Sequence, residues 1–106
     1  MAQIQVNTSE SGPSQVTVLV RGAVDSAAGD DLCGVLVDVI MRRRPERFLI
    51  DLDGVTALDS AALGLLHAAR ATAEDVNLPV AFHTVGSPIR HQLDHDGIHD
   101  DGCRTR

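Results

Sequence analysis

In this chain of 106 residues, some segments have an apolar residue at every second position and others at every third or fourth position. This change of spacing along the chain constrains the fold more than any other feature. In the segments 3–7 and 15–21 every second residue is apolar, which is typical of half-buried strands. The segment between them, 9–14, contains Gly-Pro and other turn-forming residues. Two such strands around a turn predict an antiparallel hairpin.

The next segment, 22–46, changes to a spacing of three and four residues, which predicts a helix with one apolar stripe. Asp25 or Ser26 is expected to cap its first amides, and Pro45 marks its end. A short apolar strand follows from Arg47, and the pair Asp53-Gly54 predicts a turn at its end.

From Ser60 the helical spacing returns for about four turns. The segment 78–85 reads as another strand. Ser87 followed by Pro88 predicts the start of a last helix, and Gly97 predicts its stop. The expected order is therefore β-β-α-β-α-β-α in a single domain, with no evident internal repeat. This order favours an α/β fold in which helices pack on a mixed sheet.

The composition excludes several classes of function. The net charge is −6, all nine basic residues are arginine, and aromatic residues make up 2% of the chain. Nucleic-acid binding relies on basic patches and is therefore not expected. No apolar run reaches the length of a membrane span, and no signal peptide is evident, so we expect a cytoplasmic protein without a membrane partner. Cys33 and Cys103 read as free thiols.

The stretch Thr56–Leu66 places Asp59 and Ser60 where a strand gives way to a helix, and three interpretations of Ser60 follow. A hydrolytic nucleophile requires a base and usually a Gly-x-Ser-x-Gly turn, which Leu58 and Ala62 interrupt. A helix cap by Asp59 or Ser60 needs no partner at all. A phosphoacceptor at a helix start would place a phosphate near unpaired amides and change the local charge by roughly −1.5 to −2.

The residues after Ser60 add to this question. Leu63, Leu65 and Leu66 crowd the first two turns, and Leu65 is expected to point away from the apolar stripe. Either the helix start is buried from several sides, or part of it is a docking surface.

Four segments together carry a family resemblance. They are "GAVD" (22–25), "FLIDLDGV" (48–55), "VTALDSAALGLL" (55–66) and "AFHTVGSPIRHQLDHDGI" (81–98). In this order the chain resembles a STAS domain, in particular the small anti-anti-sigma factors of bacteria, which carry an Asp-Ser-Ser/Thr-Gly-Leu-Gly motif at the start of a helix. The resemblance implies a STAS-like mixed sheet of four to five strands. It covers a core of about 3–98 in one domain, 1–106, and the polar tail 99–106 is expected to be flexible.

The resemblance also implies a function. In that family a cognate anti-sigma factor, which is a serine kinase of the histidine-kinase-like ATPase fold, phosphorylates the serine matching Ser60. The unphosphorylated protein binds this kinase so that the sigma factor is released, and a PP2C-type phosphatase resets the system. The implied partner surface comprises Asp25, Asp59, Ser60, Leu63 and Gly64. ATP and Mg²⁺ belong to the kinase, so this chain needs no cofactor, no metal and no catalytic residue of its own.

Two departures bear on that function. Ala61 replaces the second hydroxyl residue of the motif, and Ala62 replaces its glycine, so the Ala62 methyl group is expected to crowd an approaching kinase. An alternative is therefore a STAS subunit of a transport or stress-signalling complex, in which the helix start docks a partner and Ser60 is only a cap.

Other constellations are weaker. Asp51, Asp53 and Asp59 suggest a receiver-type phosphoaspartate domain, but the chain has no lysine for its mechanism. The stretch His91–Cys103 contains potential metal ligands, but Gly97 interrupts the helix before His99, so a solvated acidic and histidine-rich end is favoured over a metal site. The cluster Arg42–Arg44 is either an anion patch or the cationic end of a helix.

Overall fold

The computed structural model describes residues 2–9, 14–84, 86–95 and 97–98. The first half contains β1 (Gln3–Ser9), β2 (Gln15–Val24), α1 (Ser26–Asp38) and the short π-helix η1 (Val39–Arg43). The second half contains β3 (Arg47–Leu58), α2 (Ser60–Asp75), β4 (Val80–His83) and α3 (Arg90–His95). The expected order of strands and helices is confirmed, with η1 as an added segment at the end of α1.

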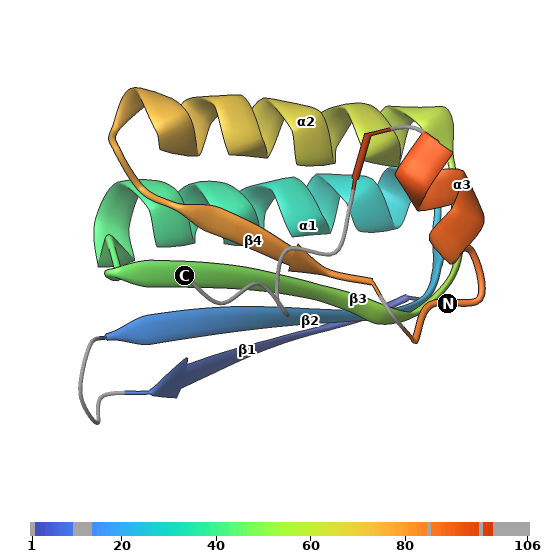
Figure 1. Ribbon diagram of the computed structural model, residues 1–106, viewed down its shortest axis with the longest axis horizontal. Helices are drawn as coiled ribbons and strands as arrows, with labels where there is room; N and C mark the ends of the chain where they lie inside the picture. Colours follow the sequence, from blue (N-terminus) through green and yellow to red (C-terminus); the bar gives the residue numbers. More distant parts are fainter. Residues whose placement is uncertain (1, 10–13, 85, 96, 99–106) are drawn as a thin grey trace.

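The four strands form one mixed sheet in the order β1-β2-β3-β4 (Figure 1). β1 pairs antiparallel with β2, as the hairpin pattern predicted, whereas β2 with β3 and β3 with β4 are parallel. Each parallel step is crossed by a helix, which returns the chain to the edge where the next strand starts. A receiver-type domain has a parallel sheet in the order 2-1-3-4-5, so the observed sheet is a different fold.

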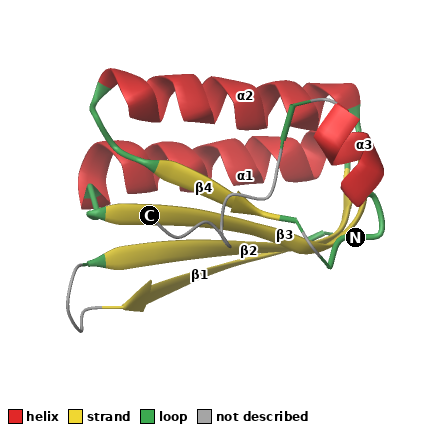
Figure 2. Cartoon of the chain, in the orientation of Figure 1, coloured by secondary structure: helices red, strands yellow, loops and turns green. Residues whose placement is uncertain are grey.

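Both long helices cover the same face of the sheet (Figure 2). α1 packs over β2 and α2 over β4, so the core lies between this helix layer and the sheet. Valine, leucine, isoleucine and alanine side chains fill most of it, with Phe48 and Phe82 as its two aromatic members. Within the described residues, every helix is too short or too polar to span a membrane.

One expected boundary is corrected by the structure. Asp53-Gly54 is not a turn, because β3 continues to Leu58 and Gly54 still pairs with Arg21 of β2. The pairing register of β2 with β3 shifts between Leu19 and Arg21 and again between Gly22 and Ala23. β3 therefore passes through Gly54 as an irregular part of the strand and does not end there. Asp53 is used differently: its carboxylate accepts a hydrogen bond from the Gly86 amide at 3.0 Å and lies 2.9 Å from Nε2 of His83.

The first long helix ends in a segment that the sequence did not predict. Its last turn widens into η1, in which the Arg44 amide donates to the carbonyl oxygen of Val39 five residues earlier. Arg44 then takes a left-handed conformation with φ 43°, which turns the chain toward Pro45 and β3. The helix therefore stops before Pro45, as predicted.

The last helix is anchored by the predicted serine. Ser87 is buried, its hydroxyl donates to the carbonyl oxygen of Val55 at 2.9 Å, and the Ile89 amide donates back to it at 3.3 Å. Gly97 has φ 90°, and the Ile98 amide donates to Leu93 at 2.8 Å, which confirms the predicted stop. Ser87 thus ties the segment before α3 to β3.

We expect Ser87→Ala to lower the free energy of unfolding by about 1–3 kcal/mol, because a buried carbonyl loses its donor. Urea unfolding followed by circular dichroism measures this change. Thr72→Ala is the control, since Thr72 lies exposed on α2 with its hydroxyl bonded to the Ala68 carbonyl, and its loss should change stability by less than about 0.5 kcal/mol. Equal effects of the two substitutions would contradict the anchoring role of Ser87.

Candidate functional site

The starts of α1 and α2 lie side by side at one edge of the sheet. β2 and β3 are parallel neighbours, and their last residues, Val24 and Leu58, are partners in the pairing register. Each strand passes directly into a helix after one residue. The amide of Asp59 also donates to the carbonyl oxygen of Val24 at 3.2 Å, which joins the two strand-to-helix corners.

An aspartate caps each of these helices. The Asp25 carboxylate accepts a hydrogen bond from the Ala28 amide at 2.9 Å, and the Asp59 carboxylate accepts one from the Ala62 amide at 2.8 Å. Both aspartates have extended backbone conformations, as residues at this position usually do. The cap is therefore the aspartate in both helices, which leaves the serine that follows as the first helical residue.

The two corners share their sequence as well as their geometry, and the sequence analysis missed this. Residues 23–28 read Ala-Val-Asp-Ser-Ala-Ala and residues 57–62 read Ala-Leu-Asp-Ser-Ala-Ala. They differ at one position only, and Ala23 and Ala57 are register partners. This repeat spans only six residues, which is far shorter than a repeated domain. The repeated Asp-Ser-Ala-Ala is nevertheless a sequence signal for two similar strand-to-helix corners.

The predicted surface residues lie together at this edge. Asp25, Asp59, Ser60 and Gly64 are exposed, whereas Leu63 is half-buried against the core. No side chain in the described part of the chain lies within 4 Å of the position that a Cβ atom on Gly64 would occupy. The edge therefore presents a hydroxyl, two carboxylates and, one turn along α2, a stretch of bare backbone.

The chemistry of Ser60 follows from its position. The amides of Ser60 and Ala61 open the helix and have no acceptor within it, so they leave partial positive charge beside the hydroxyl. Among the described residues, no hydrogen bond joins the Ser60 side chain to a histidine that would activate it, and His83 pairs with Asp53 instead. The arrangement suits a hydroxyl that accepts a group from another protein better than a self-activated nucleophile.

The two motif departures have different environments. Ala61 is exposed. Ala62 is fully buried, and its methyl group lies 3.7 Å from the position that a Cβ atom on Gly29 would occupy. The methyl group of Ala62 therefore faces α1 and fills the contact between the helices, not the outer surface where a kinase would approach.

For Leu65, the structure favours the first of the two expected alternatives, burial of the helix start from several sides. Leu65 is half-buried, and its Cδ1 lies 3.2 Å from where a Cβ atom on Gly29 would be. Together with Cys33, Leu36 and Val37 it lines a small apolar groove of about 130 Å³ between α1 and α2. The leucine cluster is thus explained mainly by burial from two sides, because α2 packs on the sheet and on α1.

The remaining constellations separate in space. Asp51 and Asp53 belong to β3, and Asp53 is held by the β4 end, whereas Asp59 caps α2. The described residues hold no group of three or more His, Cys, Asp or Glu placed for a metal ion. His91 and His95 are exposed on α3, and the tail 99–106, with His99 and Cys103, lies outside the described residues.

Comparison with known proteins identifies the fold. A family model described as Mlab, STAS domain, matches residues 7–100. No curated protein sequence matches the chain. An anti-sigma factor antagonist from Mycobacterium paratuberculosis has a similar structure, with a TM-score of 0.66 and 22% identity over 93% of this chain and 83% of that one.

Two further structures are similar. The anti-sigma factor antagonist SpoIIAA in its unphosphorylated form has a TM-score of 0.67 at 15% identity, over 90% of this chain and 86% of its own. A sulfate transporter family protein from Wolinella succinogenes has a TM-score of 0.63 at 22% identity, over 77% and 66%. The family match covers nearly the whole described fold, and the chain therefore belongs to the STAS domain family.

Proposed function

We propose that this STAS domain is an anti-sigma factor antagonist, switched by phosphorylation of Ser60. The supporting observation is the exposed Ser60 at the start of α2, directly after a capping aspartate, in the family that the sequence resembled. The partner is a serine kinase of the histidine-kinase-like ATPase fold, which supplies ATP and Mg²⁺. A PP2C-type phosphatase removes the phosphate. The similar structures named anti-sigma factor antagonists support the same class of role.

The kinase partner docks over the edge formed by Asp25, Asp59, Ser60, Leu63 and Gly64. Gly64 lets a partner backbone approach α2 closely, and Leu63 offers an apolar contact beside it. In the transfer step the Ser60 oxygen forms a bond to the γ-phosphorus of ATP, the bond to the β-phosphate oxygen breaks, and ADP leaves. The hydroxyl proton passes to a base of the kinase.

Phosphorylation then opposes docking by charge. A phosphoserine adds roughly −1.5 to −2 charges at neutral pH. At this edge it joins the carboxylates of Asp25 and Asp59, on a chain whose net charge is already −6. The phosphate is accommodated by the free amides of the α2 start, so the fold is retained while an apolar or acidic partner surface is repelled.

A second candidate function keeps the docking surface but not the phosphate. The matching family model carries the description Mlab, and one similar structure belongs to a sulfate transporter family protein. In this alternative the chain is a subunit of a transport complex, and Ser60 contributes only the first residue of α2.

Ser60→Ala tests the phosphoacceptor, and Ser26→Ala is its matched control, because both serines follow a capping aspartate in the same Asp-Ser-Ala-Ala sequence. Each variant is incubated with Mg-ATP and each serine kinase of the histidine-kinase-like ATPase fold from the same genome. We expect one kinase to add the mass of one phosphoryl group to the wild type and to Ser26→Ala, and none to Ser60→Ala. Intact-mass spectrometry measures the addition.

Labelling that persists in Ser60→Ala and disappears in Ser26→Ala would identify Ser26 as the acceptor and contradict the proposal. If no kinase labels the wild type, the subunit of a transport complex becomes the better interpretation. A pull-down that recovers a transport ATPase equally well with wild type and Ser60→Glu would support that alternative directly.

Ser60→Glu tests the switch. We expect its affinity for the identified kinase to fall by roughly tenfold or more, because a carboxylate joins the two existing ones at the docking edge. Isothermal titration calorimetry measures the affinity, with Ser60→Ala as the control that adds no charge. An acidic residue in the first helical turn is also expected to stabilise α2 by about 0.3–1 kcal/mol, so unfolding does not explain a loss of binding. Unchanged affinity of Ser60→Glu would refute the charge mechanism.

A further inference from the structure

The outer edge of β1 is open to pairing. β1 is the first strand of the sheet order, and within the described residues no strand lies on its far side (Figure 2). Edge strands usually carry charged residues or proline that prevent further pairing. β1 has neither, since its seven residues are Gln-Ile-Gln-Val-Asn-Thr-Ser. Among the described residues, this strand edge is therefore unprotected.

A cleft of about 400 Å³ runs between this strand and α1. It exists because α1 packs over β2, so the helix layer leaves Ile4 and Val6 of β1 only half-buried. Its apolar part comes from Val6, Val35 and Val39. Gly34 adds empty space, because a Cβ atom there would meet nothing within 4 Å.

Three aspartates border the cleft on the α1 side: Asp30, Asp31 and Asp38. Asp38 is already paired with cations of η1, since its carboxylate oxygens lie 3.6 Å from Nε of Arg42 and 3.7 Å from Nε of Arg43. Asp30 and Asp31 are exposed and have no ion pair or hydrogen bond from their side chains to another described residue.

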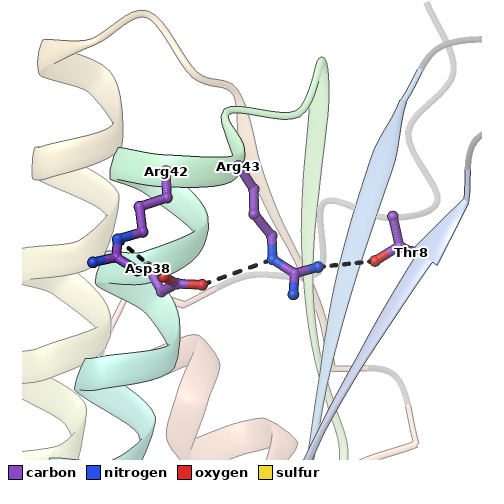
Figure 3. Close-up of polar contacts among 4 residues, drawn as sticks. All are labelled: Thr8, Asp38, Arg42 and Arg43. Atoms are coloured by element: carbon purple, nitrogen blue, oxygen red, sulfur yellow. Dashed lines mark hydrogen bonds and ion pairs between the residues drawn. The ribbon is translucent and has the colours of Figure 1, made fainter.

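An arginine of the protein itself already occupies part of this cleft. The Arg43 guanidinium lies between α1 and β1, next to Asp38, and its Nη1 donates to the hydroxyl of Thr8 at 3.1 Å (Figure 3). One end of the cleft is thus occupied by an internal cation that joins helix and edge strand. Asp31 lies seven residues before Asp38, about 10 Å along the helix, where no such cation is present among the described residues.

We propose that this cleft and the β1 edge bind an extended basic segment of a partner protein. The segment adds to the sheet as a fifth strand beside β1, and its alternate side chains on the helix side enter the cleft. Arginine or lysine at these positions lays its aliphatic stem over Val6 and Val35 and brings its charge to Asp30 and Asp31. This site lies on the side of α1 away from α2, and the inference does not depend on Ser60.

Charge favours such a partner over a second copy of this chain. Pairing β1 with β1 of another copy would bring two acidic clefts together, each on a chain of net charge −6. A basic segment instead meets the carboxylates of Asp30 and Asp31, which have no cationic partner among the described residues. Main-chain hydrogen bonds would then provide affinity, and the aspartates would select for positive charge.

Binding of a fluorescent seven-residue peptide that alternates arginine and valine, measured by anisotropy, tests the proposal. We expect the peptide to bind wild type, the glutamate counterpart to fail, and affinity to fall with added salt. The double variant Asp30→Asn/Asp31→Asn should bind about tenfold more weakly, because two exposed charge pairs are lost. Asp75→Asn, an exposed aspartate at the end of α2, is the control and should bind like wild type.

Two further measurements separate strand addition from simple charge attraction. Gly34→Leu fills the cleft while improving helix propensity, so it should abolish binding in a protein that remains folded. Methylating alternate backbone nitrogens of the peptide should abolish binding for one of the two alternate sets only, because a strand pairs through one edge. Equal binding by both methylated sets, full affinity in the double variant, or a dimer that the peptide dissociates would overturn the proposal.

Discussion

The parallel pairing of β2 with β3 determines where the candidate functional site of this domain lies. Because Val24 and Leu58 end their strands in register, the helices that follow start side by side, and the Asp59 amide bonds to the Val24 carbonyl. Each helix start needs an acceptor for its first amides, and an aspartate supplies one at both corners. Because Asp59 is the cap of α2, the hydroxyl of Ser60 is not needed for capping.

The contact between α1 and α2 depends on small residues at those same starts. Gly29 and Ala62 allow the helices to approach, and Leu65 fills the remaining space from α2. A larger residue at position 29 would meet Leu65 at once, since even a Cβ atom would be 3.2 Å from it. Ala62, which replaces the glycine of the family motif, is therefore part of the contact between the helices. The other residues of the motif form its accessible face.

Two groups of aspartates, at the helix starts and beside β1, have different consequences. At the helix starts, Asp25 and Asp59 are capping residues, and each carboxylate accepts a hydrogen bond from an amide of the first helical turn. Beside β1, the side chains of Asp30 and Asp31 have no hydrogen bond or ion pair to another described residue, while Arg43 contacts Asp38 and Thr8 at the far end of the cleft. In the proposed function, an added phosphate would increase the negative charge at the first edge, whereas the carboxylates beside β1 would attract the proposed basic segment.

The sequence alone was sufficient for the order of elements, the hairpin, the stops at Pro45 and Gly97 and the family, because these depend on local periodicity and on turn chemistry. It misplaced the end of β3, since pairing of Gly54 with Arg21 and the bonds from Asp53 to Gly86 and His83 keep the strand extended where the dipeptide favours a turn. Only the tertiary structure decided that Leu65 is covered, that the Ala62 methyl group faces α1 and that Asp25 lies beside Asp59. Those facts depend on contacts between segments more than thirty residues apart, which no local pattern of residues encodes.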